Sequence, residues 1–373
     1  MKTTFSITRA FAIAKKELMH ILRDPFTLGL GIGMPIIFVI FFGFAIDFDF
    51  KDVKVAVYDF DNSRQSRQLS EIFSASGYFK ALEGKNPGNP IYDVESERAF
   101  ASMVIKPGFA KNLVSGKSNR VQILIDGTDN QKSGVVAGYF MGIYNAALSR
   151  FSDRQIRSPV KLETRFKYNP ELNSKWFIVP GLIVLVVGLL SILMTALTVA
   201  REWENGSMEL LLSTPVTPLE IVMGKITPYV GLVFIGIFIV YFISLVFFNV
   251  PFMGSYIFFF IACLVYIFVS LAEGILISVI TRQQQKAMQF SFVAGLLPSL
   301  ILSGFIFPVE NMPAFFQYFT MILPPRWFMT IIRAVFLKGS GLLALWVPFS
   351  ILVVMGTVLV IAAAKKFKRD IEQ

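Results

Sequence analysis

A chain of 373 residues in which 54% are hydrophobic, with 39 Phe, has the composition of a protein that crosses a membrane several times. Its formal net charge of +10 does not indicate a nucleic-acid partner, because the charges are distributed as in membrane proteins. The single cysteine, Cys263, lies inside an apolar run, so a disulfide framework and a zinc site are excluded and a helix-packing role is expected.

The basic residues predict the membrane topology. Thirteen Lys and Arg fall in four segments that we place on one side of the membrane, whereas three fall in the short loops on the other side. This positive-inside distribution predicts that both termini are cytoplasmic. The four segments are residues 1–23, 201–225, 282–286 and 365–369, and the three opposing residues are Arg326, Arg333 and Lys338.

An amphipathic helix is predicted at residues 5–22, where apolar and basic side chains recur at helical spacing. We expect this N-terminal segment, residues 1–24, to lie on the cytoplasmic surface with its cations toward anionic lipid headgroups. No small-residue cleavage site follows it, which argues against a cleavable signal peptide. Asp24 and Pro25 are residue types that cap and start a helix, so the first span is expected over residues 25–46.

Glycines are frequent in this first span. They indicate either the close approach of a neighbouring helix, which we favour, or a single helix in which glycine has no packing role. The glycines are Gly29, Gly31, Gly33 and Gly43.

A soluble domain is predicted over residues 47–175, which hold 34 of the 60 charged side chains in near balance. The order of apolar runs and polar helical stretches predicts an α/β domain, outside the membrane, whose strands are covered by helices. Strands are expected at 54–58, 101–105 and 120–126, and helices at 63–74, 107–113 and 132–156.

This domain contains two patterns that could suggest a metal or nucleotide site. Asp59, Asp61, Asp126 and Asp129 each follow a strand, where acids commonly cap helices and turns, so we do not expect a metal. Gly116-Lys117-Ser118 resembles part of a phosphate loop, but the glycine required five residues earlier is replaced by Lys111. No cofactor is therefore expected in this chain, and no ATP hydrolysis by it.

A hydrophilic stretch, Arg201–Pro215, follows the second span, Trp176–Ala200. Helix-capping residue types precede an apolar group flanked by acids, and Thr217-Pro218-Leu219-Glu220 is a start signal for the next helix. A short helix held between two spans in the loop at 201–220 is suited to docking into another protein. The residues expected to do so are Arg201, Glu202, Glu204, Gly206, Ser207, Met208, Glu209, Leu210, Leu211, Thr214 and Pro215.

The remaining chain, within the transmembrane region 176–364, predicts four further spans. Ile226–Ala272 is uncharged over 47 residues, enough for two helices with a turn at Asn249–Gly254. After a short loop at 282–286, we expect a fifth span at Ala287–Val309, a proline-marked outer segment at 310–338 that dips back or lies at the interface, and a sixth span at Leu342–Ala364 before a basic tail at 365–373. The fold class is thus a polytopic α-helical membrane protein with six transmembrane helices and an inserted α/β extracytoplasmic domain.

Charged residues within or beside the spans are candidates for a transport path. Glu273 is nine residues before Arg282, and an intramembrane carboxylate is a functional-site hypothesis by default. The alternative is a hydrogen-bonded contact between helices, for example to Ser270 or Ser278. Arg326 and Arg333 are seven apart on one helical face, where lipid headgroups are the favoured neighbours and an anionic or amphipathic cargo is the alternative.

Several of these stretches carry a family resemblance. Glu202–Pro215, with Pro218-Leu219-Glu220 and Gly224-Lys225, resembles the coupling region of membrane subunits of ATP-binding-cassette type 2 (ABC-2) exporters. The segment ending in Arg23-Asp24-Pro25 is similar to the family's N-terminal elbow, which can also contact the ATPase. The outer segment with Pro308, Glu310 and Pro324-Pro325 is similar to its outer gate region, and Val55-Ala-Val-Tyr-Asp59, Val104–Phe109 and Ile125–Asp129 resemble the external domain of its drug-efflux branch.

The resemblance implies the transmembrane (permease) subunit of an exporter of drug-like or lipid-like cargo in a bacterial inner membrane. A separate ABC ATPase would bind ATP and Mg²⁺ and engage residues 201–215, and a second permease, a copy or a sister chain, would complete the path. Membrane lipids, a periplasmic membrane-fusion protein and an outer-membrane channel are further implied partners. Glu273, Pro308, Glu310 and Arg326 are candidates for the path.

Two other functions are compatible with the residues. A secondary transporter could be driven by a proton gradient through Glu273, although such folds usually contain several intramembrane polar groups and repeated halves. A non-transporting scaffold or sensor could use the external domain alone.

Overall fold

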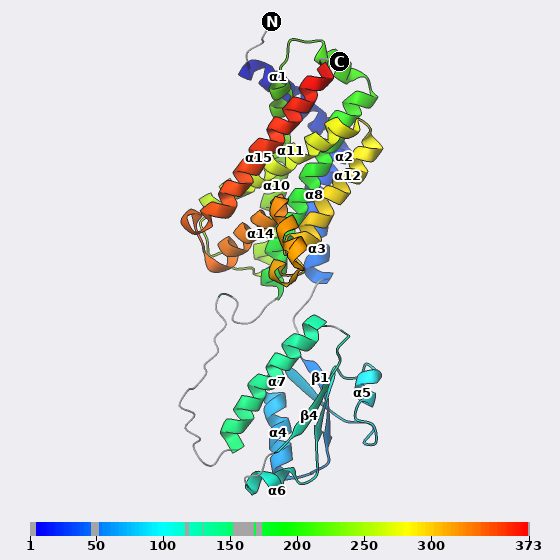
Figure 1. Ribbon diagram of the computed structural model, residues 1–373, viewed down its shortest axis with the longest axis vertical. Coiled ribbons are helices and arrows are strands. Elements are labelled where there is room, and N and C mark those ends of the chain that lie inside the picture. The colour runs from blue at the N-terminus through cyan, green and yellow to red at the C-terminus, as the bar shows by residue number, and fades with distance from the viewer. Residues whose placement is uncertain are drawn as a thin grey trace. The chain divides into compact units, whose positions relative to one another are not determined.

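The computed structural model describes residues 5–45, 52–115, 119–128, 130–151, 168 and 174–371. The chain divides into two compact units, Met1–Asp47 with Phe166–Gln373 and, inserted between these two stretches, Phe48–Arg165 (Figure 1). The division falls close to the limits at 47 and 175 that the change in charge density indicates.

The first unit is helical, and its elements follow the apolar runs of the sequence. In chain order they are α1 (Ile7–Arg23), α2 (Pro25–Leu28), η1 (Gly29–Gly33), α3 (Met34–Ala45), α8 (Ser174–Glu204), α9 (Ser207–Leu212), α10 (Pro218–Phe248), α11 (Tyr256–Thr281), α12 (Gln284–Leu297), η2 (Pro298–Leu302), η3 (Val309–Asn311), α13 (Ala314–Phe319), η4 (Thr320–Ile322), α14 (Pro324–Arg333), η5 (Ala334–Lys338) and α15 (Leu342–Ile371).

Among the described residues, five helices are long and apolar enough to cross a membrane. They are Pro25–Ala45, Lys175–Glu204, Pro218–Phe248, Tyr256–Thr281 and Leu342–Phe367. A further pair, Ala314–Ile322 and Pro324–Lys338, is bent by 91° and has the form expected for a segment that dips back.

The fifth span differs from the prediction of one helix over Ala287–Val309. The α-helix ends at Leu297, continues as a π-helical turn from Pro298, and ends at Leu302. Proline lacks a backbone N–H and crowds the preceding turn, which interrupts the regular hydrogen-bond pattern of this helix at Pro298. The expected fifth span is thus a shorter, broken helix, and it is not among the five helices that are long and apolar enough to cross a membrane. The basic residues after Ala364 continue α15 to Ile371 instead of forming a separate tail.

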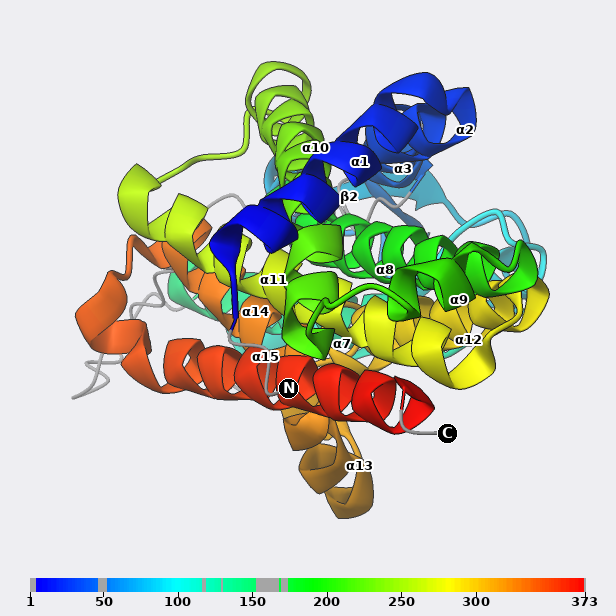
Figure 2. The same cartoon turned by 90° about the horizontal axis from the view of Figure 1, so that it is seen from above.

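The long helix α8 is the centre of the helical unit, since 94% of its most apolar window is buried (Figures 1 and 2). Small residues let its neighbours approach closely. At Gly274 of α11, an added Cβ would lie 2.3 Å from the carbonyl oxygen of Ile192 in α8. The Thr195 hydroxyl of α8 lies 3.0 Å from the carbonyl oxygen of Leu271 in α11.

The glycine-rich first span packs through only two of its four glycines. A Cβ at Gly31 would overlap Leu232 of α10, and one at Gly43 would overlap Phe248 of the same helix. Gly29 and Gly33 have open space around them. The prediction of close helix approach is thus confirmed for Gly31 and Gly43 alone.

The second unit contains a four-stranded sheet in the order β2-β1-β3-β4. The β1 strand pairs in parallel with β2 and β3, and β4 is antiparallel to β3. The elements are β1 (Val53–Asp59), α4 (Arg64–Ala75), β2 (Phe79–Glu83), α5 (Tyr92–Glu95), β3 (Ala101–Ile105), α6 (Phe109–Val114), β4 (Val121–Ile125) and α7 (Asn130–Phe151). The sequence prediction missed β2 and α5, and residues 152–156 of its last helix lie outside the described residues.

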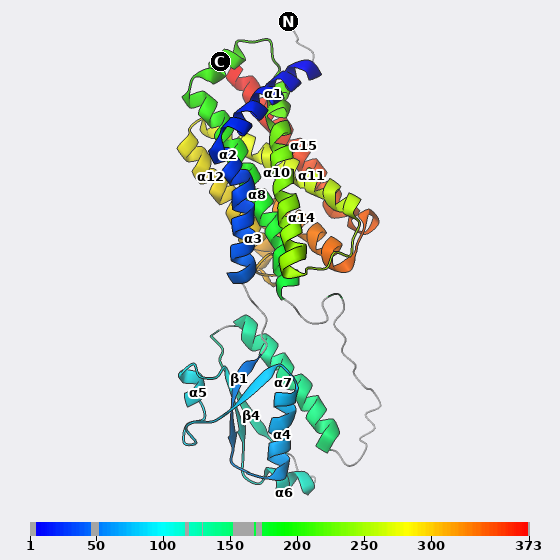
Figure 3. The same ribbon diagram turned by 180° about the vertical axis from the view of Figure 1, so that it is seen from behind.

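Helices α4 and α7 lie against one face of this sheet (Figure 3). Phe73 of α4 and Phe140 of α7 are buried with Phe79 of β2 and Met103 of β3 in one core cluster. Burial of such side chains is the main source of stability for a unit of this size.

The acidic residues after β1 act as caps. The Asp61 carboxylate accepts hydrogen bonds from the backbone N–H of Gly108, Phe109 and Ala110 at the start of α6, with distances from 2.7 to 3.0 Å. Hydrogen bonds from the Ser63 hydroxyl and from these N–H groups hold the pKa of Asp61 below its usual value. Asp129 and Gly116-Lys117-Ser118 lie outside the described residues.

Candidate functional site

The stretch Arg201–Pro215, which we predicted to be one loop, begins as a helix. Arg201, Glu202 and Glu204 belong to the last turn of α8, which ends at Glu204, so the loop assignment is wrong for these residues. Gly206 then takes a φ of 72°, a left-handed conformation that favours glycine, and the chain turns into α9. The Ser207 hydroxyl donates a hydrogen bond back to the Glu202 carbonyl, which fixes this turn from within.

Helix α9 has an inner and an outer face. Met208 is fully buried, whereas Leu210 is 72% exposed and Glu209 next to it is also exposed. The hydroxyls of Ser213 and Thr214 donate to the carbonyls of Leu210 and Leu211, which ends the helix before Pro215. The short helix is thus held in place while one large apolar side chain points away from the protein.

The start signal of α10 is confirmed. Thr217 is the N-cap, Pro218 is at the first position, and Thr217 and Glu220 form a reciprocal capping box. No pattern in the sequence indicates that the buried Glu220 carboxylate also binds the start of α1. It accepts from the backbone N–H of Ser6 at 2.5 Å and from the Arg9 guanidinium at 2.8 Å.

A buried ionic cluster joins α1, α8 and α10, and we refer to Lys16, Glu17, Glu202 and Lys225 as the Lys225 junction. The Lys225 ammonium lies 2.9 Å from Glu17 and 2.7 Å from Glu202, and its side chain is 1% exposed. Lys16 also binds Glu202, at 2.5 Å. Because a buried cation is stable only when paired, the two carboxylates compensate its charge. In Figure 2, α1 lies across the end of α10.

A second contact joins the end of α1 to α8. Asp24, the N-cap of α2, accepts from the Phe26 N–H at 3.0 Å and pairs with Arg201 at 3.3 Å. Burial alone would raise the pKa of Asp24, but hydrogen bonds from Thr27 and Arg201 outweigh it and lower the pKa. Pro25 occupies the first position of α2, as predicted, and the predicted contact residue Arg23 is exposed.

A polar cavity of about 210 Å³ lies beside these contacts, between α1, α8 and α10. Its wall includes the junction residues Lys16, Glu17 and Glu202, together with Asp24 and Arg201. The end of α8 therefore contacts α1 through pairs of oppositely charged side chains.

On its opposite side, the end of α8 contacts the connection between α11 and α12. Glu204 accepts from the Gln284 backbone N–H at 2.8 Å and also binds its side-chain amide. The Arg282 guanidinium lies 4.6 Å from the centre of the Trp203 ring. The expected loop at 282–286 is a tight turn, since α11 ends at Thr281 and α12 starts at Gln284.

Glu273, on α11, is half-buried, and it makes no hydrogen bond to any described residue. The expected contact with Ser278 is not formed, because Ser278 binds α8 instead. The Ala200 N–H donates to the Ser278 hydroxyl at 2.7 Å, and that hydroxyl donates to the Ala196 carbonyl. The hydrogen-bonded contact between helices that we considered for Glu273 is thus made by Ser278.

The outer arginines bind the protein itself. Arg326 donates to the Gln317 carbonyl and to the Thr320 hydroxyl, the latter at 2.6 Å. Arg333 donates to the carbonyls of Gly304 at 2.8 Å and Phe305 at 3.2 Å. The expectation that both arginines face lipid headgroups is therefore wrong, because the guanidinium groups instead satisfy carbonyls of an irregular backbone.

The other outer candidates are at the surface of the bent segment. Pro308 precedes the short helix η3, and both Pro308 and Glu310 are exposed. The Glu310 carbonyl accepts a hydrogen bond from the Gln317 side chain at 3.1 Å. Neither the polar cavity beside α1 nor the apolar cavity between α10, α11 and α15 is lined by Pro308, Glu310, Arg326 or Glu273.

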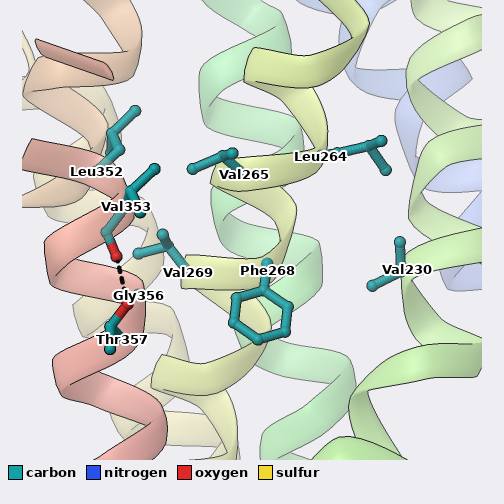
Figure 4. Close-up of a pocket in the computed structure, with 9 residues that line it drawn as sticks. All are labelled: Val230, Leu264, Val265, Phe268, Val269, Leu352, Val353, Gly356 and Thr357. Carbon is teal, nitrogen blue, oxygen red and sulfur yellow. Dashed lines mark hydrogen bonds between the residues drawn. The ribbon is translucent and has the colours of Figure 1, made fainter. Parts of the chain in front are cut away.

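A separate apolar cavity of about 360 Å³ lies between α10, α11 and α15 (Figure 4). The Thr357 hydroxyl in its wall is hydrogen-bonded to the Val353 carbonyl at 2.8 Å, so the wall offers no free polar group. It is lined by Val230, Leu264, Val265, Phe268, Val269, Leu352, Val353, Gly356 and Thr357.

Known proteins resemble this chain over most of its length. A family model described as ABC-2 family transporter protein matches residues 25–365. Two proteins of Escherichia coli (strain K12), the probable multidrug ABC transporter permeases YbhS and YbhR, are each 31% identical to it. The YbhS match covers 89% of both chains, and the YbhR match covers 97% of this chain and 99% of YbhR. The inner membrane transport permease YhhJ of the same organism is 28% identical over 85% of both chains.

These matches agree with the structure of the helical unit. Its apolar helices, together with the permease relatives of the chain, support a multi-pass protein of a bacterial inner membrane. The family model covers the elements from α2 to α14 and most of α15, including the α8, α9 and α10 part of the candidate site, and it begins after α1. The chain therefore belongs to the ABC-2 family of transporter proteins, as the transmembrane subunit of an ABC exporter.

Proposed function

We propose that this subunit forms the path for a drug-like or lipid-like cargo and that the outer face of α9 docks into a separate ATPase, which binds ATP and Mg²⁺. The observation that carries the proposal is the contrast between the buried Met208 and the 72% exposed Leu210. An exposed leucine beside Glu209, on a helix fixed at both ends, is suited to insertion into an apolar pocket with a polar rim.

The same proposal assigns the sides of the membrane. The basic segments at residues 1–23, 201–225, 282–286 and 365–369 support cytoplasmic termini and place α9 on the same side as the ATPase. The unit at Phe48–Arg165 then lies in the periplasm, where a membrane-fusion protein and an outer-membrane channel are its proposed partners. A second permease, identical or related, completes the path.

The drug-like cargo is supported by relatives whose names include multidrug ABC transporter permease. The apolar cavity between α10, α11 and α15 shows that the helical unit can leave apolar space of about 360 Å³ between its helices.

Leu210→Asp tests the docking. The ATPase should co-purify with this variant at a level at least about tenfold lower, which is about 1.4 kcal/mol of binding free energy, because a charge replaces the apolar contact. Val114→Asp is the matched control, since Val114 is 81% exposed but lies in the other unit. Co-purification of the ATPase with the Leu210→Asp variant at the wild-type level would refute docking through α9.

A further inference from the structure

The two acids at the end of α8 both bind neighbouring parts of the helical unit, Glu202 in a largely buried site and Glu204 at the surface. Glu202 binds Lys16 and Lys225 on one side, and Glu204 binds Gln284 on the other. Residues two apart on a helix do not share a face, so the two carboxylates reach different neighbours. One helical turn is thereby fastened to two separate parts of the helical unit.

The attachment of α1 to α10 has three points along its length. Arg9 pairs with Glu220, and Glu17 pairs with Lys225. Between these two pairs the helices touch directly, because a Cβ at Gly224 would lie 2.8 Å from the Ala10 carbonyl oxygen. Contacts of this number and closeness restrict sliding and rotation of α1 on α10.

Three of the four charges of the Lys225 junction are shielded from solvent, whereas Lys16 is 44% exposed. The side chains of Lys225, Glu17 and Glu202 are 1%, 4% and 13% exposed. Separation of these charges would leave each of them buried without a partner, so the cluster resists opening far more than an exposed ion pair does.

We propose that Glu202, Glu204 and Lys225 are positioning residues that join α1, α8, α10 and the α11–α12 turn into one block, which the ATPase moves as a unit through α9. The inference rests on the proposed docking function of α9. It changes the role of Glu202 and Glu204, which hold the block together instead of contacting the ATPase.

Two spin labels can test whether the block is rigid. Cys263, the single cysteine of the chain, is buried, so labels can be directed to Lys15→Cys on α1 and Gln285→Cys on α12, both of which are exposed positions. The distance between the labels is measured by pulsed electron paramagnetic resonance in the full chain bound to its ATPase, without nucleotide and after trapping with ATP and vanadate. We expect the same distance in both states, and a distance that changes on trapping would overturn the proposal.

A variant with a neutral junction tests the cause of the rigidity. Glu17→Gln, Glu202→Gln and Lys225→Met together remove all three buried charges, and the remaining Lys16, which is 44% exposed, stays solvated, so that no buried charge is left unpaired and folding is preserved. In this variant we expect the label distance to change on trapping, because α1 is released from α8 and α10. An unchanged label distance on trapping in this variant would overturn the positioning role, and a lower unfolding temperature alongside it would show that the cluster only stabilises the fold.

Glu204→Gln tests the contact on the other side of α8 independently. This variant should release the α11–α12 turn, so that the distance to the label at Gln285→Cys changes on trapping. Glu209→Gln is the control, because Glu209 is exposed on α9 and outside the block. Failure of docking through α9 would instead be seen as normal ATPase binding by Leu210→Asp, so the two proposals fail in different experiments.

Discussion

Lys225 illustrates how the role of one residue depends on distant parts of the chain. It lies in the first turns of an apolar helix, where a lysine would ordinarily extend toward headgroups. Here it is buried against Glu17, which is 208 positions away in sequence. In the sequence, Lys225 has the position of a charge that flanks a membrane span. In the structure, it is the centre of the Lys225 junction.

Asp93 in the second unit gives a prediction at the same scale. It is fully buried and accepts from the Tyr58 hydroxyl at 2.5 Å, the Lys85 N–H at 2.9 Å and Arg98 at 2.6 Å. Burial alone would raise the pKa of Asp93, but these hydrogen bonds and the charge of Arg98 outweigh it and lower the pKa below 3.8.

The pKa of Asp93 is lower in the folded than in the unfolded chain, so its charged form favours folding. This contribution is present above the unfolded value of about 4 and is lost as the pH falls through the folded value. Asp93→Asn should therefore lower the free energy of unfolding by about 1–3 kcal/mol at pH 7, and by less near pH 3. Thermal unfolding of the full chain at both pH values is the measurement, and an equal loss at both would contradict the assignment.

Helix α10 shows why close packing matters at the level of an element. Its residues Gly224 and Gly231 are both helical glycines, but only Gly224 lies against α1. A Cβ there would lie 2.7 Å from the Ile13 Cβ, whereas nothing lies within 4 Å of one at Gly231. The sequence does not distinguish Gly224 from Gly231, and the fold gives these two glycines different roles.

Gly224→Ala should displace α1 and cost about 1–3 kcal/mol of stability, because the clash involves backbone atoms. Gly231→Ala should be neutral or stabilising by about 0.5–1 kcal/mol, as for alanine replacing an exposed helical glycine. Limited proteolysis by trypsin at Lys15 and Lys16 reports the release of α1, and thermal unfolding reports stability. Equal cleavage rates in the two variants would argue against tight packing of α1 on α10.

At the scale of the whole molecule, the question is what drives transport. The membership in the ABC-2 family favours ATP, and the half-buried Glu273 is the one residue that motivated a proton-driven alternative. Glu273 makes no hydrogen bond to any described residue, so its replacement by glutamine removes a charge without breaking a described contact.

We therefore expect Glu273→Gln to retain ATP-driven export within about twofold, equivalent to about 0.5 kcal/mol. Uptake of ethidium into everted vesicles, which corresponds to export in the cell, is measured with ATP, both without and with an uncoupler that collapses the proton gradient. Loss of export in the variant, with stimulation of the ATPase by the permease still intact, would favour the gradient mechanism instead.

The elements that depend on local chemistry could be predicted from the residues alone. Long uncharged runs require a nonpolar environment, and these runs correctly predicted the positions of α8, α10, α11 and α15. The capping residues Asp24 and Thr217 correctly predicted where two helices start. Strands β1, β3 and β4 were also predicted near their observed limits.

Tertiary structure alone decided which side chains meet. The short strand β2 has a mixed pattern and forms only by pairing with β1, so no periodicity revealed it. The partners of Glu202, Glu204, Glu220 and Lys225 are far apart in sequence, and charge type cannot select one partner among many. The ion pairs at the end of α8 exist because packing brings α1, α10 and α12 to the same helical turn.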